Sequence, residues 1–448
     1  MEIKNQWVRY VLPFSYKNTD KDTYNSICKK IDEKTYSNKK GEQKSMWRRI
    51  TFEEYGELDL YEHIKKIAQG EDSNEKIWVT SDDIGRKDIY FDENGEKVRI
   101  YINKMGIQLF FSGVGFLWFE ADLQTKDNRK LLERNNILKE FAYTREFYEK
   151  KGRDIYEKFD FGNYILSHIS DIPINTYFIN RTKNIEGKKI LIPDKYLIFS
   201  WFLSSDSVEG NESENFIKLF SKGYTYKYKV NETEGFFEPF DNFIWSSCKE
   251  GCGGIAMQDA NNSDSTVFFE SNFESRLEIY FQLYILVMNQ YYSNLMFLDE
   301  LADIPREIKK CNVKSLEAMD DRFSLMQIQS NHLQVSHITH QNEFYRYLKA
   351  VMKLDIIVEE IEYKIEAVKI KVETYKEEVK RKRMLYFTWI STIFVFVEML
   401  DGVSSVVTLF KGGMSWEAKT SLNVMGIVAA VVFLVWSIYY LVSNNKKR

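Results

Sequence analysis

The stretch from Met384 to Phe410 reads MLYFTWISTIFVFVEMLDGVSSVVTLF. Glu398 and Asp401 are its only charged residues, and its first half is strongly apolar. A helix of this length can cross a hydrocarbon core of ~30 Å. We therefore predict a transmembrane helix over residues 384–410.

A second uncharged stretch lies between Thr420 and Asn445. Its centre, NVMGIVAAVVFLVWSIYYLV, is again long enough to cross a bilayer, and Trp436 is an aromatic residue of the kind that gathers at membrane interfaces. We predict an outer loop over 411–422, a second transmembrane helix over 423–443 and a basic cytoplasmic tail over 444–448.

Basic residues flank the two predicted spans. They are Lys380, Arg381, Lys382, Arg383, Lys446, Lys447 and Arg448. Cytoplasmic flanks carry an excess of lysine and arginine, so both chain ends are predicted to be cytoplasmic. There these residues would form a basic ring that raises an electrostatic barrier or binds anionic headgroups. The sequence thus predicts a multi-pass protein of the bacterial inner (cell) membrane, with the lipid bilayer as a partner.

Residues 345–383 contain neither proline nor glycine and are rich in charge. Apolar side chains recur there at alternating steps of four and three residues, at Leu354, Val358, Ile361, Ile365, Val368, Val372, Tyr375 and Val379. This heptad pattern is typical of a coiled coil. We predict a stalk helix that associates with other copies and continues into the first span. The alternative is one amphipathic helix packed in a globular domain.

Polar residues of the first predicted span fall on one helix face. They are Thr388, Ser391, Glu398, Asp401, Ser405 and Thr408. Carboxylates at bilayer depth are costly and usually mark ion pathways, and rings of them favour cations. We predict that these residues line a pore. The alternative is a protonated carboxyl, or one near the outer interface where water reaches it.

The first 275 residues carry several runs typical of strands. KDIYF and KVRIYI flank a turn at Asn94-Gly95, and YTYKYKV (224–230) is a further candidate. Helical patterns lie at 57–69 and 128–150. We predict an α+β or α/β sensor domain over 1–275 and a helical part over 276–344. The very apolar segment 274–299 is predicted to be a buried helix of the core.

Composition and motifs exclude several function classes. The 448 residues include 62 Lys and Arg against 66 Asp and Glu, a net charge of -4, so no direct binding of nucleic acid is expected. No nucleotide-binding or nucleophile motif is present, and we predict that the protein is not an enzyme. Cys248 and Cys252 are more typical of a glycine-rich turn than of a metal site. His332, His337 and His340 are more typical of an ordinary helix.

The order of these parts resembles the CorA family of divalent-cation channels. Trp389-Ile390-Ser391-Thr392-Ile393-Phe394 is similar to the opening of that family's pore helix, and the tail Asn444–Arg448 is similar to its terminal basic cluster. The resemblance covers about the last quarter of the chain. It implies a homo-oligomer, pentameric as in that family, with Mg²⁺ or another divalent cation as permeant or regulatory ion and no other cofactor.

The family signature Gly-Met-Asn is missing. Its nearest match, Gly413-Met414-Ser415, lies further along than the family spacing implies, and Glu398 and Asp401 occupy a helix that is free of carboxylates in the family. Divergent members associated with type III CRISPR systems also lack the signature and have an enlarged cytoplasmic domain. The chain resembles those members in both respects.

The predicted function follows from this resemblance. We expect an oligomeric CorA-like membrane cation channel, an antiviral effector that opens when a nucleotide-type signal binds its cytoplasmic domain. One alternative is housekeeping transport of magnesium or other divalent cations, gated by the metal at acidic residues such as Glu317, Asp320 and Asp321. A second alternative is a non-conducting, membrane-anchored coiled-coil scaffold.

Overall fold

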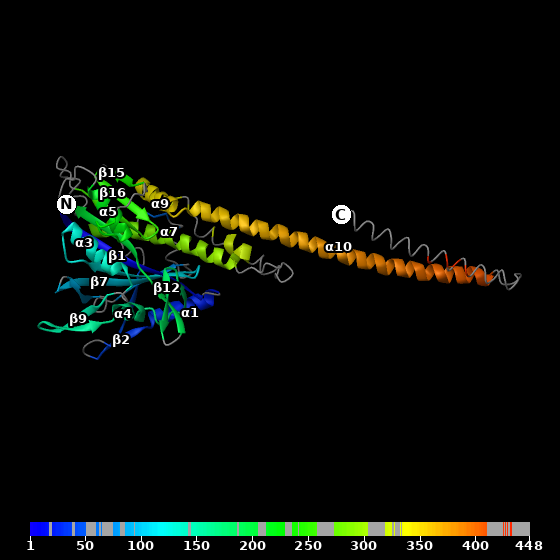
Figure 1. The fold of residues 1–448 in the computed structure, drawn as a ribbon, viewed down its shortest axis with the longest axis horizontal. Coiled ribbons are helices and arrows are strands. Elements are labelled where there is room, and N and C mark those ends of the chain that lie inside the picture. Colours follow the sequence, from blue (N-terminus) through cyan, green and yellow to red (C-terminus); the bar gives the residue numbers. More distant parts are fainter. Residues whose placement is uncertain are drawn as a thin grey trace. The chain divides into compact units, whose positions relative to one another are not determined.

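A computed structural model gives the fold (Figure 1). It describes isolated positions and the segments 1–17, 20–37, 41–50, 75–80, 86–93, 95–141, 145–185, 188–204, 212–228, 235–240, 242–257, 273–302, 319–324 and 334–409. The chain divides into two compact units, of which the first comprises Met1–Ile304 with Glu317–Tyr363. The second comprises Pro305–Leu316 with Lys364–Arg448.

The first unit is built on a large mixed sheet. Its strands follow the order β10-β9-β6-β7-β8-β1-β14-β17-β16-β15, and β11, β4 and β5 pair beside this path. The strands are β1 (Ile3–Tyr16), β4 (Trp47–Ile50), β5 (Glu75–Thr80), β6 (Lys87–Glu93), β7 (Glu96–Phe110), β8 (Val114–Asp122), β9 (Phe147–Gly152), β10 (Ile155–Phe159), β11 (Ile174–Tyr177), β14 (Leu197–Ser204), β15 (Phe237–Phe240), β16 (Phe243–Cys248) and β17 (Gly251–Ala256). Two small ribbons pair β2 (Thr35–Ser37) with β3 (Gln43–Ser45) and β12 (Asn180–Ile185) with β13 (Lys188–Pro193).

Long central strands determine the register of this sheet. β1 pairs antiparallel with β14 on one edge and with β8 on the other, while β14 and β17 run parallel. The predicted hairpin is confirmed: β6 and β7 pair from Lys87↔Ile102 to Glu93↔Glu96. Gly95 in its turn has φ 89°, a conformation that glycine adopts without a steric cost, and its N–H donates to Asp92.

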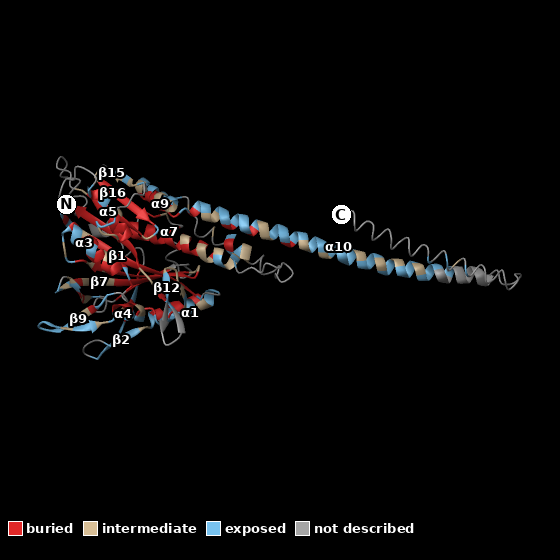
Figure 2. Cartoon of the chain, viewed as in Figure 1, coloured by how far each residue is buried: buried red, intermediate tan, exposed pale blue. Residues whose placement is uncertain are grey.

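Helices cover both faces of the sheet. On one face lie α1 (Lys21–Asp32), α3 (Asn128–Lys139), α4 (Phe161–Ser167) and α5 (Glu212–Lys222). Asp20, Asp127 and Asp160 cap the first three of these helices by accepting backbone N–H bonds. On the other face lie α7 (Phe273–Ala302) and α9 (Thr339–Val351). Their apolar side chains and those of the sheet form two cores, one on each face (Figure 2).

The predicted core helix at 274–299 is confirmed as α7. Its side chains are buried from Leu277 to Met288. Several polar residues of α7 are buried as well, including Glu278, Gln282 and Asn289. Because buried polar groups need partners, these residues connect α7 to the sheet at specific positions.

Helix α10 is continuous from Leu354 to Leu409. The positions of the predicted heptad are the less exposed ones: Leu354, Ile361, Ile365 and Val372 are buried, and the other four are half-buried. From Met384 onward, large apolar side chains are exposed over most of the helix surface (Figure 2). The side chains of α10 are described as far as Met399 and at Gly402.

The predicted fold class required two C-terminal transmembrane helices and is wrong. Across the part of the chain that the structure describes, no helix is sufficiently long and apolar to cross a membrane. In α10 the uncharged run from Met384 ends at Val397, a rise of about 21 Å against a core of ~30 Å, and Glu398 follows it. The predicted membrane localisation and the predicted transmembrane channel architecture both depend on these two spans. They are therefore wrong as well. The loop 411–422, most of 423–443 and the tail 444–448 lie outside the described residues.

Two predictions in the first unit are also wrong. The helical pattern at 128–150 divides into α3, which ends at Lys139, and strand β9. The backbone of Glu140 turns extended (ψ 128°) and forms a bridge with Lys195, so tertiary pairing overrides the helical pattern. The predicted strand 224–230 forms a turn over its described residues, in which Tyr228 N–H donates to the Thr225 carbonyl. The helix predicted at 57–69 lies almost entirely outside the described residues.

Candidate functional site

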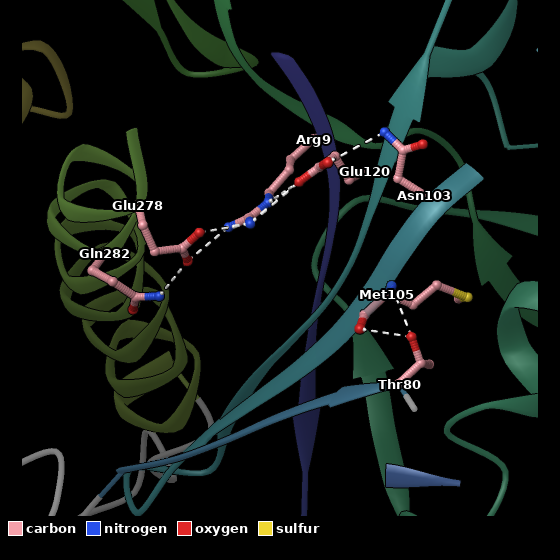
Figure 3. Close-up of polar contacts among 7 residues, drawn as sticks. All are labelled: Arg9, Thr80, Asn103, Met105, Glu120, Glu278 and Gln282. Atoms are coloured by element: carbon pink, nitrogen blue, oxygen red, sulfur yellow. Dashed lines mark hydrogen bonds and ion pairs between the residues drawn. The ribbon is translucent and has the colours of Figure 1, made fainter. Parts of the chain in front are cut away.

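A buried ion cluster connects the sheet to α7. Arg9 of β1, 2% exposed, donates from Nη1 and Nη2 to the two carboxylate oxygens of Glu278 on α7, at 2.8 and 2.6 Å (Figure 3). From Nε and Nη2 it also reaches Glu120 Oε2 on β8, each at 3.4 Å. Arg9 and Glu120 are register partners in the antiparallel ladder, so their side chains share a face. The shorter, bidentate pair is the one with Glu278.

Aromatic rings enclose the guanidinium. Its central carbon lies 4.2 Å from the ring centre of Trp7, 4.0 Å from that of Trp118 and 4.4 Å from that of Phe281. Rings at this distance attract a cation through their π-electrons. They also exclude water, so the charges of the cluster interact with one another more strongly than they would at the surface.

Polar side chains extend the cluster in two directions. Gln282 donates to Glu278 at 3.2 Å and accepts from Gln108 at 2.9 Å. On the other side Asn103 Nδ2 donates to Glu120 Oε1 at 3.3 Å (Figure 3). Asn103 stands where the pairing of β7 and β8 shifts register. Beside this irregularity Thr80 Oγ1 accepts from Met105 N–H at 3.2 Å and fixes β7 against the end of β5.

A hollow of about 570 Å³ opens beside Glu120. It exists because β1 and β8 pair only from Arg9↔Glu120 onward to Ser15↔Val114, and residues 4–8 of β1 diverge from the end of β8. Residues 4–8, 120–122, 124–126 and Asn103 line the space. Glu120 therefore contacts the ion cluster on one side and the hollow on the other, and 15% of its side chain is exposed.

Hydrogen bonds hold the rim of the hollow in place. Gln6 spans the gap, donating to the Thr125 carbonyl at 3.0 Å and accepting from Leu123 N–H at 3.3 Å. Gln124 adopts a left-handed backbone (φ 53°), and its N–H donates to Asp122 at 2.8 Å. Arg134 of α3 donates to the carbonyls of Leu123 and Gln124 at 2.6 and 2.8 Å. A rim fixed in this way needs little ordering when a molecule binds.

The pore-lining residues predicted on α10 lie far along the chain from this site. Thr388, Ser391 and Glu398 are exposed on α10, and the Thr388 hydroxyl donates to the Met384 carbonyl of its own helix. The basic residues 380–383 are exposed on the same helix. Asp401, Ser405 and Thr408 lie within the bounds of α10, but their side chains are outside the description. Gly413, Met414, Ser415, Lys446, Lys447 and Arg448 lie outside the described residues.

The other residues considered for chemistry are dispersed. His337 packs against Tyr61 with the two rings tilted by 58°, whereas His340 Nδ1 lies 2.8 Å from the Tyr280 hydroxyl. Asp320 is half-buried and Asp321 exposed, and Glu317 is not among the described residues. In the described segments no group of three or more His, Cys, Asp or Glu residues could hold a metal ion.

The two cysteines of the predicted turn are buried as thiols in the paired strands β16 and β17. Burial raises the pKa of Cys252 well above its usual value. Because the thiolate is the reactive form of cysteine, this position favours an inert thiol of the core.

The sequence analysis missed Arg9, Glu120 and Glu278. Each is a charged residue beside or within an apolar run: Arg9 in WVRYVLPF, Glu120 after FLWF and Glu278 before IYFQLYILV. Charged side chains are almost never fully buried unless they are paired. Three such charges next to strongly apolar residues are the signal that could have found the cluster.

The chain was compared with protein-family models, with curated proteins and with solved structures, and none of them matches.

Proposed function

We propose that the sheet domain is a receptor for a small polar molecule, with the hollow beside Glu120 as its binding site. The observation that carries the proposal is a concave space of about 570 Å³ next to a buried ion cluster. Small-molecule sites occupy roughly 300–1,000 Å³ and combine a preformed shape with a few placed polar groups. Glu120, Asn103 and Gln6 supply such groups.

A thermal-shift experiment tests the receptor. The full chain is heated with the common L-amino acids, ATP, spermidine and citrate, each at millimolar concentration. A compound that binds only the folded chain at about 100 times its Kd stabilises it by roughly 2.7 kcal/mol. We expect at least one compound to raise Tm by about 3–6 °C. ATP represents the nucleotide-type signal that the family resemblance implies.

A matched pair of variants locates the binding. Lys126→Trp places an indole on the rim of the hollow, and Lys151→Trp places one at an exposed position of β9. The Tm shift should vanish in the first variant and persist in the second. The receptor proposal fails when no compound shifts Tm, or when Lys126→Trp responds as the wild type does.

A second candidate function is a scaffold that joins copies of the chain through α10. Its observation is the exposed apolar surface of Met384–Met399, where Tyr386 and Phe387 each expose 70% and Phe394 exposes 66%. Nine large apolar side chains, at roughly 100 Å² each, give on the order of 900 Å², whereas the largest patch of a typical monomer is about 300–600 Å². The excess favours a second copy of the same helix as occupant.

Sedimentation tests the scaffold. The wild type should sediment as an oligomer, and Phe394→Glu should shift it toward the monomer. Thr374→Glu adds the same charge at an exposed position before the apolar stretch and should leave the assembly intact. A monomeric wild type at all concentrations would exclude this function.

A further inference from the structure

We propose that the hollow takes a zwitterionic molecule of amino-acid size, whose protonated amine binds Glu120 and whose anionic group binds Lys126. This inference rests on the proposed receptor and adds the chemical class of its ligand. The charges of the ion cluster, the geometry of Glu120 and the composition of the rim carry it.

The ion cluster has one carboxylate more than guanidinium groups. Arg9 engages Glu278 by two short bonds of 2.6 and 2.8 Å, so that pair is neutralised in good geometry. Its two contacts with Glu120 are both 3.4 Å, near the limit of a hydrogen bond. Arg9 therefore compensates the second carboxylate only in part, and a further protein cation near it is Lys104, its register partner on β7. A partly buried carboxylate in this position is stabilised by an additional cation.

Lys104 is the nearest alternative cation from the protein. It is half-buried beside the cluster and feels the charges of Glu278 and Glu120. Burial lowers the pKa of Lys104, and the positive charge of Arg9 lowers it further, whereas the two carboxylates raise it. Lys104 does not line the hollow. It leaves the hollow side of Glu120 available to a cation that enters from solvent.

Glu120 has acceptor capacity on the side of the hollow. Asn103 occupies one lone pair of Oε1 at 3.3 Å, and Arg9 approaches Oε2. An ionised carboxylate offers about four acceptor sites. A protonated amine donates three N–H bonds, and a bond between two charged groups is shorter and stronger than one between neutral groups. An ammonium group thus matches the acceptor capacity that Asn103 and Arg9 leave on Glu120.

The rim carries charge of the opposite sign. Lys4 and Lys126 are exposed and line the hollow from its two sides. Asp122, the other carboxylate of the lining, accepts from the N–H of Gln124 and from its side-chain amide, so it is engaged within the turn. A molecule that bears only negative charge would meet Glu120 without a counter-charge. A molecule with both an amine and an acid can pair its amine with Glu120 and its acid with the rim residue Lys126.

Calorimetric titration of the full-length wild type tests the class. The tightest-binding L-amino acid is compared with its N-acetyl and its carboxamide derivatives. N-acetylation removes the ammonium charge and should weaken binding by about tenfold or more. The carboxamide removes the anionic group and should weaken it by about threefold to tenfold. These two comparisons need no variant and so do not depend on how a variant folds.

Variants then assign the contacts. Glu120→Gln should weaken binding of the amino acid by about tenfold or more, and Glu157→Gln, an exposed carboxylate on β10, should leave it unchanged. Lys126→Met should give the smaller loss expected of a surface charge. Equal binding by the N-acetyl derivative, or by Glu120→Gln, would overturn the zwitterion. ATP binding that depends on Lys126 but not on Glu120 would overturn the zwitterion proposal and preserve the receptor proposal. If no compound binds, both proposals are overturned.

Discussion

Trp78, Trp118 and Trp245 of the sheet are fully buried, whereas Tyr386, Phe387 and Phe394 on α10 expose 66–70% of their surface. The sheet domain surrounds its large apolar side chains with two layers of helices, and pairs its buried charges as well. The described part of α10 leaves its apolar stretch uncovered. Large apolar side chains therefore form the core of the sheet domain, whereas on α10 they form an exposed surface.

The largest loss of stability is expected when the cation at the centre of the sheet domain is removed. Arg9→Met leaves the buried Glu278 and the partly buried Glu120 without the guanidinium that pairs with both. Breaking a buried pair in this way costs about 3–5 kcal/mol. We expect urea denaturation to show a loss of that size in the free energy of unfolding.

A surface ion pair provides the control for Arg9. Arg99 and Asp88 form a 2.7 Å pair whose side chains are 46% and 42% exposed. Arg99→Met should cost less than about 1 kcal/mol. Equal losses in the two variants would mean that the Arg9 cluster contributes no more than a surface pair.

Acid should weaken the sheet domain through His168. Burial, the largest cause, and the nearby charge of Lys34 lower the pKa of His168 to about 4, although its Nδ1 contacts the Tyr164 carbonyl. Between this pKa and the unfolded value of about 6.5, the unfolded chain binds a proton that the folded chain does not. Stability is therefore complete above pH 6.5 and falls as the pH drops toward 4, by roughly 3 kcal/mol.

Denaturation at pH 7 and pH 4.5 checks this prediction. His168→Gln should remove most of the difference between the two pH values. His337→Gln, at an exposed position beside Tyr61, should retain it. A wild-type stability that does not change over this range would contradict the buried neutral histidine.

A substitution that disturbs packing within the sheet should have an intermediate effect on stability. A methyl group at Gly106 on β7 would overlap the indole of Trp118 on β8, which is fully buried. Gly106→Ala should therefore cost about 1–3 kcal/mol. At Gly152 on β9 the nearest atom would be Ile155 Cδ1 at 3.6 Å, an ordinary contact, so Gly152→Ala should be nearly neutral. Thermal unfolding of the two variants would measure the difference.

The same contrast explains how much of the fold the sequence could predict. Local signals succeeded where neighbours in sequence are neighbours in space, as in the β6–β7 turn at Gly95 and in helix α7. They failed at Glu140, where a bridge to Lys195 ends the helix. Hydropathy alone was misleading at Met384–Val397, because an exposed apolar helix and a membrane span begin with the same residues.

The candidate site was beyond the reach of pattern reading for a related reason. Arg9, Glu120 and Glu278 are separated by more than a hundred residues and meet only through the register of β1 with β8 and the docking of α7. Each residue is visible in the sequence as a charge in an apolar run. Which charges pair, and that a hollow opens where β1 and β8 diverge, follows from the topology of the whole sheet.

The smallest expected effect on stability belongs to α10. It distinguishes most directly between apolar residues that pack within the chain and apolar residues that form an exposed surface. At a concentration where the chain is monomeric, Phe394→Glu should change the free energy of unfolding of the sheet domain by less than about 0.5 kcal/mol, because the side chain is 66% exposed. With rising concentration, the wild type should gain stability by mass action and the variant should not. A large loss already in the monomer would show that Phe394 packs within its own chain, and α10 would then resemble the sheet domain in the use of its apolar residues.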